Sequence, residues 1–399
     1  MKIGIFVDIL TNKKTGVEYY TQNLLQHLLE MDIKNQYCLI RHDGVGVDFE
    51  SEKKYTEIVC KKRNQSILFL RRFINVLPRQ ITLTVIRQIL KFVPSIYYST
   101  NKKLRSFDIL FSPNFGLELE TNPRAYQIVI VYDITPIRVP QCHNKEVGIF
   151  FNAVLGDILK KADKIIAISE FTKRDLITHY GIVEEKISVI YPGLNRHMTR
   201  TPKSCDIVKK YNLPEDFILS FGTLEPRKNA IAVVKSFALL KKDGRREMLV
   251  IAGRKGWGYE DVFVTLKQLG LEKSVLFTGY VDEEDVPGLY GAARLLVYPA
   301  LYEGFGLPVI EAMSCGCPVI TSSTSSLPEA GGDAALYIDP TDEKQIYEAM
   351  KKVIGSEELR GDMIMKGLIQ ASKFNWDESA RKVIKIFEEA ERAMHNERI

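Results

Sequence analysis

The sequence alternates short apolar, β-branched runs with longer helical segments, and this alternation constrains the fold more than any other feature. In the first half the apolar runs lie at 2–8, 37–41, 55–60, 108–112, 127–133, 164–169 and 187–191. In the second half they lie at 217–222, 248–253, 275–279, 294–299, 318–322 and 335–338. Apolar strands separated by helices are typical of parallel sheets that are covered on both faces. The sequence therefore predicts an α/β chain with doubly wound, Rossmann-like sheets.

The length of 399 residues allows two domains, each with its own hydrophobic core. Residues 197–214 are polar, contain two prolines and show no apolar period before Val208, so they are predicted to be a linker. The two domains are then expected at 1–196 and 215–375. Residues 376–399 are predicted to be a separate amphipathic helix, because apolar side chains recur there at helical spacing: Ala380, Val383, Ile384, Phe387 and Met394.

The segment ALYEGFGLPVIEAMSCGCP, residues 300–318, joins a predicted strand to a predicted helix. The residues between the two are Glu303, Gly304, Phe305, Gly306 and Leu307. Pro308 stands where a first helical residue is expected. The glycines let the backbone bend and turn its N–H groups toward a ligand, and a helix N-terminus favours an anion. This turn is therefore a candidate site for a phosphate or diphosphate.

Two carboxylates accompany the turn, Glu303 in the loop and Glu311 one turn inside the helix. An ionised carboxylate only accepts hydrogen bonds, which suits the vicinal diols of a ribose or a hexose. Arg227 and Lys228 follow another predicted strand at the same sheet edge, and they can offset the repulsion between the carboxylates and a diphosphate. Arg254 is a second-rank candidate of the same kind. Taken alone, the two glutamates fit better as a solvated loop charge and a residue favoured by the helix dipole.

The whole phrase EGFGLPVIEAMSCGCPVI, residues 303–320, resembles the E-x7-E motif of retaining glycosyltransferases of family 4, which have the two-domain GT-B fold. The resemblance continues through FGTLEPRKN at 221–229, GYV at 279–281 and SSLPEAGGDAA at 325–335. It implies two Rossmann-like domains that face each other across a cleft, with the last helix crossing back onto the first domain. It also implies a nucleotide-sugar donor held mainly by the second domain, retention of the anomeric configuration and no obligatory metal.

The resemblance implies roles for single residues as well. Glu303 is expected nearer the transferred sugar and Glu311 nearer the ribose, while Tyr280 belongs to the segment beside the nucleobase. Without a metal, Arg227, Lys228 and the helix that follows the turn must stabilise the departing diphosphate.

In the first half, the loop after the first predicted strand contains a single glycine, Gly16, so the G-x-G-x-x-G fingerprint of nicotinamide-binding folds is absent. In the family this loop approaches the donor phosphates or the acceptor. Tyr132 and Asp133 end another predicted strand, where many relatives carry His-Asp and the histidine contacts the transferred sugar. Tyr132 can donate and accept a hydrogen bond but cannot be cationic. Simple packing of this tyrosine against its neighbours is an equally good interpretation.

The composition, with 45% hydrophobic and 26% charged residues, is typical of a globular protein. No apolar run reaches the roughly 18 residues that a membrane-spanning helix needs. The N-terminus, MKIGIFVDIL, fits a first strand better than a secretory signal, so a cytoplasmic protein is expected. Six scattered cysteines without a C-x-x-C pair predict reduced thiols and no zinc site.

The net charge of +5 is unevenly distributed, because residues 61–105 contain 11 Lys or Arg and no Asp or Glu. Within this basic segment, apolar and cationic residues of 66–99 recur at roughly helical spacing. The pattern supports the hypothesis of peripheral binding to the anionic inner face of the plasma membrane. A pair of ordinary domain helices is the alternative. Nucleic acid is a poor fit, because the segment interleaves aliphatic side chains more than stacking aromatic ones.

Together these features predict a retaining, metal-independent hexosyltransferase in cell-surface polysaccharide synthesis. The donor is a nucleotide-diphosphate sugar, with GDP-mannose as the first candidate, and the acceptor is a growing glycan or a lipid-linked acceptor. The alternatives are a nucleotide-sugar epimerase or a phosphorylase on the same fold, or a non-catalytic membrane- or glycan-binding scaffold. A phosphorylase would hold a pyridoxal cofactor, an epimerase would convert the donor without an acceptor, and a scaffold would not hydrolyse it.

Overall fold

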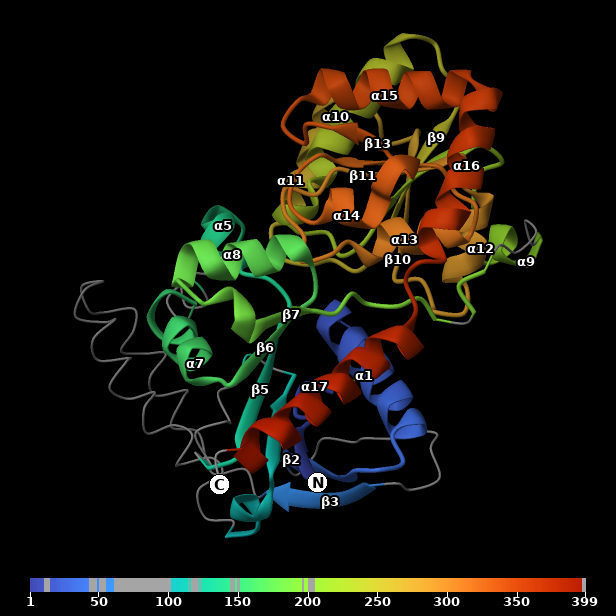
Figure 1. Ribbon diagram of the computed structural model, residues 1–399. Coiled ribbons are helices and arrows are strands. Elements are labelled where there is room, and N and C mark those ends of the chain that lie inside the picture. Colours follow the sequence, from blue (N-terminus) through green and yellow to red (C-terminus); the bar gives the residue numbers. More distant parts are fainter. Residues whose placement is uncertain are drawn as a thin grey trace. The chain divides into compact units, whose positions relative to one another are not determined.

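The computed structural model of the chain is shown in Figure 1. It describes residues 1–10, 15–42, 49, 55–60, 102–113, 115, 122, 124–143, 148, 151–195, 197–199 and 205–396. The chain divides into two compact units. Unit 1 consists of Met1–Pro192 and Trp376–Ile399, and unit 2 consists of Gly193–Asn375. The polypeptide therefore passes between the units twice, after Pro192 and after Asn375.

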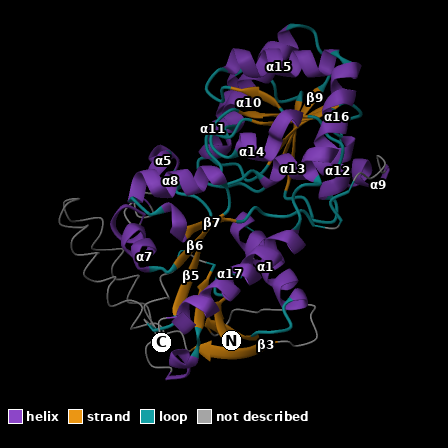
Figure 2. Ribbon diagram, in the orientation of Figure 1, coloured by secondary structure: helices purple, strands orange, loops and turns teal. Residues whose placement is uncertain are grey.

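Within the described residues, unit 1 has a seven-stranded parallel sheet in the order β3-β2-β1-β4-β5-β6-β7. Figure 2 shows the strands in orange. The strands are β1 (Lys2–Phe6), β2 (Gln36–His42), β3 (Tyr55–Cys60), β4 (Ile109–Ser112), β5 (Tyr126–Val131), β6 (Lys164–Ala167) and β7 (Ile187–Val189). Each coincides with one of the apolar runs of the first half. The central strands β4 and β5 are almost wholly buried, which explains why their sequences do not alternate with polar residues.

Helices and short helical turns connect these strands. In the described part of unit 1 they are η1 (Lys102–Ser106), η3 (Pro140–Cys142), η4 (Phe151–Leu155), η5 (Glu184–Lys186), α1 (Gly16–Met31), α5 (Thr135–Arg138), α7 (Gly156–Lys161), α8 (Glu170–Tyr180) and α17 (Trp376–Asn396). Local sequence sets the ends of α8. The Ser169 hydroxyl accepts a hydrogen bond from the Thr172 amide at 3.0 Å, and Gly181 ends the helix in the left-handed conformation.

The last helix, α17, packs against α1 within unit 1, and Figure 1 shows the two helices side by side. His27 Nδ1 lies 2.7 Å from Asp377 Oδ1, and Lys34 Nζ lies 2.9 Å from Glu391 Oε2. The Ser379 hydroxyl donates to the carbonyl oxygen of Tyr191 at 2.7 Å. The predicted return of the C-terminal helix to the first domain is therefore confirmed.

Unit 2 has a six-stranded parallel sheet in the order β10-β9-β8-β11-β12-β13. The strands are β8 (Phe217–Phe221), β9 (Met248–Ala252), β10 (Val275–Gly279), β11 (Leu295–Tyr298), β12 (Val319–Ser322) and β13 (Leu336–Ile338). All six were predicted from the apolar runs of the second half. The predicted fold class, with two doubly wound parallel sheets, is confirmed.

The helical elements of unit 2 follow the strands in alternation. They are η6 (Pro226–Lys228), η7 (Gly332–Ala334), α9 (Cys205–Lys210), α10 (Ala230–Lys242), α11 (Glu260–Gln268), α12 (Val286–Ala292), α13 (Leu307–Ser314), α14 (Leu327–Gly331), α15 (Glu343–Gly355) and α16 (Glu357–Ala371). Helix α9 lies inside the segment 197–214 that the sequence suggested as a linker. This part of the segment is helical and belongs to unit 2.

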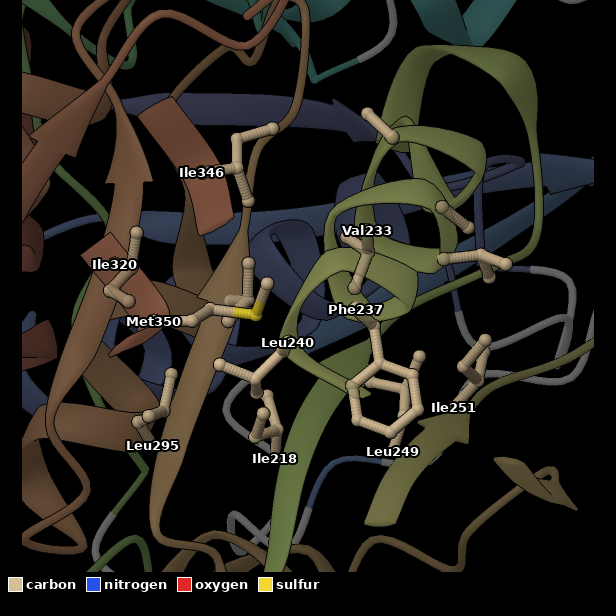
Figure 3. Close-up of a cluster of buried hydrophobic side chains, with 14 of the residues drawn as sticks. Ile218, Val233, Phe237, Leu240, Leu249, Ile251, Leu295, Ile320, Ile346 and Met350 are labelled. Carbon is tan, nitrogen blue, oxygen red and sulfur yellow. The ribbon is translucent and has the colours of Figure 1, made fainter. Parts of the chain in front are cut away.

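The core of unit 2 forms where α10 and α15 pack on the sheet (Figure 3). Phe237 of α10 and Met350 of α15 are fully buried in this cluster. They lie among the strand residues Ile218, Leu249, Leu295 and Ile320. This packing fixes the strands, and therefore also the loops that leave their carboxyl ends.

Most of the basic segment, residues 61–101, lies outside the described residues, so the membrane hypothesis stays a prediction. Its last residues, 102–105, begin the turn η1. Among the helices of the described residues, none is long and apolar enough to cross a membrane.

Candidate active site

The turn after β11 places Glu303 at the carboxyl edge of the sheet of unit 2. Helix α13 begins at Leu307, with Pro308 in its first turn, as the sequence predicts. Gly306 caps the helix with a φ of 104°, in the left-handed region. A Cβ atom there would lie 2.6 Å from Leu327 Cδ2, so glycine is required for both backbone and space. Phe305 is buried and packs edge-to-face on Phe374 at 5.1 Å, so this side chain anchors the turn.

Glu303 is the centre of a buried cluster of charges. Its Oε2 lies 2.7 Å from Arg227 Nη1, and its Oε1 lies 2.5 Å from Lys228 Nζ. Burial alone would raise the pKa of Glu303, but the two cations outweigh it and lower the pKa to about 2. The carboxylate is therefore ionised throughout the physiological range. Lys228 and Glu303, which lie 75 positions apart in the sequence, come together here with Arg227 in one cluster.

Lys228 has a second oxygen partner, the Tyr298 hydroxyl, at 2.6 Å. The same hydroxyl lies 2.8 Å from Glu303 Oε1. Burial lowers the pKa of Lys228, and Glu303 acts in the opposite direction. Sequence reasoning missed Tyr298, because a tyrosine at the end of an apolar strand looks like a core residue.

Arg227 is held on several sides. Its Nη2 lies 2.6 Å from Glu225 Oε1, its Nη1 donates to the Tyr302 carbonyl oxygen at 2.8 Å, and its own carbonyl accepts from the Leu301 amide at 2.9 Å. These contacts join the loop after β8 to the loop after β11. Glu225 was not singled out from the sequence, although its position two residues before Arg227 in LEPRK was the available signal.

The backbone of Glu303 is fixed by the loop after β12. Its amide donates to the Ser325 hydroxyl at 3.1 Å, and its carbonyl oxygen accepts from the Ser326 hydroxyl at 2.8 Å. Ser325 has a φ of 55°, which is uncommon for a residue other than glycine. Residues in such conformations cluster at functional sites, where surrounding contacts hold them. Neither serine was predicted as a site residue.

Glu311 lies on α13 and has a different environment from Glu303. It is 7% exposed, and the Tyr290 hydroxyl of α12 donates to its Oε2 at 3.2 Å. Burial raises the pKa of Glu311 to about 7, and the hydrogen bond from Tyr290 only partly opposes this shift. The two carboxylates of the motif therefore differ in protonation, one fully ionised and one close to half-protonated at neutral pH.

Arg254 and Tyr280 follow β9 and β10 at the same sheet edge and contact each other. The guanidinium carbon of Arg254 lies 4.2 Å from the Tyr280 ring centroid, and the tyrosine is 39% exposed. The backbone of Arg254 is fixed because its carbonyl oxygen accepts from the Leu224 amide at 2.8 Å. The pair presents a planar, positively charged surface beside the loop after β8, which carries Arg227 and Lys228.

The predicted site residues of the first half all belong to unit 1. Gly16 is the first residue of α1, and a Cβ atom there would contact nothing within 4 Å. Tyr132 is buried, its hydroxyl donates to the Pro113 carbonyl oxygen at 2.8 Å, and it lies 2.7 Å from the Thr21 hydroxyl. Asp133 is half-buried and accepts a hydrogen bond from the Thr135 amide at 2.9 Å.

Among the residues that the structure describes, no group of three or more His, Cys, Asp or Glu side chains is placed to hold a metal ion. Cys38, Cys315 and Cys317 are buried free thiols, and Cys60 and Cys142 are buried as well.

Solved structures share this architecture. Sucrose-phosphate synthase from Thermosynechococcus elongatus superposes with a TM-score of 0.77 at 18% identity, covering 98% of this chain and 99% of that one. Anabaena Alr3699/HepE, solved in complex with UDP and glucose, superposes with a TM-score of 0.70 at 17% identity, covering 97% and 99%. At these identities the likeness concerns the fold, which is the GT-B fold of glycosyltransferases.

Sequence comparisons define the family. A model described as Glycosyltransferase Family 4 matches residues 14–197, and one described as Glycosyl transferases group 1 matches residues 206–369. The O-antigen chain mannosyltransferase B of Escherichia coli is 34% identical over 284 residues, which cover 70% of this chain and 74% of the relative. The chain therefore belongs to glycosyltransferase family 4, a family of retaining hexosyltransferases.

A further relative is much longer than the region of likeness. The serotype-specific mannosyltransferase WbdA of Escherichia coli is 32% identical over 235 residues, or 57% of this chain. The match spans 29% of the length of WbdA.

Proposed function

We propose that this glycosyltransferase transfers mannose, with retention, from GDP-mannose to a growing cell-surface polysaccharide or its lipid-linked precursor. The mannose assignment is supported by the names of the two relatives above, both mannosyltransferases and one of them named as an O-antigen chain mannosyltransferase. A nucleotide-diphosphate donor is supported by the complex of HepE with UDP and glucose. The choice of GDP as the nucleotide keeps GDP-mannose, the first donor candidate of the sequence analysis.

The buried cluster of Arg227, Lys228 and Glu303 is the observation that carries this proposal. It lies at the start of α13, where helix N–H groups and two cations converge at one sheet edge. The two cations bind the diphosphate and stabilise the charge that develops on it when the glycosidic bond breaks. The acceptor hydroxyl then attacks from the same face of the sugar and passes its proton to a departing phosphate oxygen.

The two glutamates take different hydroxyl groups of the donor. Glu303 has about four acceptor positions, of which Arg227, Lys228 and Tyr298 use three, and the fourth accepts from a hydroxyl of the sugar. Glu311 accepts from the ribose. Arg254 and Tyr280 flank the nucleobase, while the backbone of Gly304, Phe305, Gly306 and Leu307 lines the diphosphate.

Unit 1 supplies the acceptor side. Gly16 begins α1 without a side chain that would obstruct a ligand, and Asp133 offers a half-buried carboxylate at the end of β5. The Tyr132 hydroxyl already bonds to Pro113 and Thr21. Tyr132 therefore acts by holding the end of β5 in place beside Asp133, rather than as a cationic partner of the sugar.

Calorimetric titration with GDP, GDP-mannose and UDP-glucose tests the proposal. Arg227→Ala and Lys228→Ala should each weaken free GDP and GDP-mannose alike, by on the order of 1.5 to 3 kcal/mol, because both residues meet the diphosphate. Arg294→Ala is the matched control, since Arg294 pairs with Asp216 at 2.9 Å at the start of β11, the opposite edge of the sheet. Unchanged GDP affinity in both site variants would overturn the assignment.

A further inference from the structure

The Tyr298 hydroxyl stands between the two charged groups of the site. It lies 2.6 Å from Lys228 Nζ and 2.8 Å from Glu303 Oε1, and those two atoms are themselves 2.5 Å apart. The tyrosine is the last residue of β11 and is 2% exposed. The three polar atoms therefore form a closed triangle at the carboxyl end of a rigid strand.

The chemistry of the three groups allows a single arrangement of protons. An ammonium only donates and an ionised carboxylate only accepts, so the Tyr298 hydroxyl accepts from Lys228 and donates its one proton to Glu303. Two of the three N–H groups of Lys228 are then directed to Tyr298 and Glu303. The third N–H group of Lys228 is used by neither of these two partners. The Tyr298 ring supports the same ammonium, whose Nζ lies 5.1 Å from the ring centroid.

We propose that Tyr298 is a positioning residue of the donor site, which fixes Lys228 and Glu303 relative to each other so that the third N–H of Lys228 meets the diphosphate. The inference rests on the proposed function of this site. Holding a long, flexible lysine in one rotamer before the ligand arrives removes an entropic cost from binding. A phenylalanine would keep the buried ring but leave Lys228 with one acceptor fewer.

The same trio occurs a second time in unit 2, on the surface. The Tyr347 hydroxyl lies 2.6 Å from Asp243 Oδ2 and 3.0 Å from Lys351 Nζ, and the lysine and the carboxylate are 2.7 Å apart. Asp243 stands at the C-terminal end of α10, whereas the site lies before its N-terminal end. The two tyrosines share the same bonding pattern, and only Tyr298 belongs to the site.

The test compares Tyr298→Phe with Tyr347→Phe. Tyr298→Phe should raise the Kd for free GDP and lower kcat/KM with GDP-mannose, each by about tenfold, the effect of one hydrogen bond to a charged group. Tyr347→Phe should leave both unchanged. The double variant Tyr298→Phe/Lys228→Gln should bind free GDP no more weakly than Lys228→Gln, because the tyrosine acts on the diphosphate through the lysine.

The pH dependence of GDP binding separates positioning from mere support of the fold. Lys228 is faced by Glu303, Arg227, Glu225 and the Tyr298 hydroxyl. Removal of that hydroxyl takes one acceptor from the charged lysine, so the basic limb of GDP binding should move to lower pH. The basic limb of GDP binding should keep its pH in Tyr347→Phe.

Each outcome decides the inference. The inference is overturned if Tyr298→Phe, Tyr347→Phe and the natural sequence bind GDP with the same affinity and with the basic limb at the same pH. Additive losses in the double variant would do the same, and so would a Tyr298→Phe chain that cannot fold, since the hydroxyl would then support the unit rather than the site. If the natural sequence itself binds neither GDP nor UDP, the proposed function fails first.

Discussion

Replacing Glu311 with glutamine should remove a pH dependence of the free energy of unfolding, which arises because Glu311 is buried in unit 2. Folding raises the pKa of Glu311 from 4.5 to about 7. Between these values the folded state keeps a proton that the unfolded state has lost, so the free energy of unfolding falls as the pH rises through this window. At about 1.4 kcal/mol per pKa unit, the loss is about 3 kcal/mol. Glu311→Gln has no proton to lose.

Urea unfolding at pH 5, 6, 7 and 8 measures this difference directly. The stability of Glu311→Gln relative to the natural sequence should increase by about 2 to 3 kcal/mol from pH 5 to pH 8. Glu343→Gln is the control, because Glu343 lies on the exposed surface of the same unit, paired with Lys235. Parallel stability curves for the natural sequence and Glu311→Gln would refute the reasoning.

Donor binding should show the complementary effect. In the proposed function, ribose hydroxyls donate to the ionised form of Glu311, so the affinity for GDP-mannose should fall by up to about tenfold for each pH unit below 7. The diphosphate of GDP-mannose does not titrate in this range, so calorimetry in buffers of different ionisation enthalpy should detect proton release from the protein. Glu311→Gln should bind more weakly and without this pH dependence. Equal pH dependence in both proteins would exclude Glu311 as the ribose ligand.

Two further predictions concern other parts of the chain. Gly253→Ala should lower the free energy of unfolding by at least about 3 kcal/mol, because its Cβ would lie 1.9 Å from the Gly222 carbonyl oxygen. The control Gly270→Ala, with a φ of 65° and open space, should lower it by about 1 kcal/mol. Similar losses in urea unfolding would contradict the close approach of the loops that carry Gly222 and Gly253. The basic segment should bind anionic liposomes in flotation assays, less so at high salt, and substitution of its arginines by glutamine should weaken binding. The positions to change are Arg71, Arg72, Arg79 and Arg87. An unbound protein at low salt would contradict the membrane hypothesis and favour a soluble acceptor.

The sequence by itself determined the elements and their class. The central strands β4 and β5 were visible as apolar runs, because a parallel strand covered on both faces needs no polar residues. The beginning of α13 was equally visible, since Gly306 and Pro308 report local backbone requirements. The E-x7-E phrase gave the family, and the comparisons confirmed it. These features are local, so neighbouring residues are enough to specify them.

Tertiary structure alone decided which side chains meet in the candidate site and how burial affects them. Glu303 meets Arg227 and Lys228 only because the loops after β8 and β11 leave one sheet edge together. The opposite pKa shifts of Glu303 and Glu311 arise from burial with and without cations, and two glutamates eight positions apart carry no sign of this in the sequence. Electrostatic energy depends on distances and on solvent access, which the chain acquires only when strands distant in sequence pair.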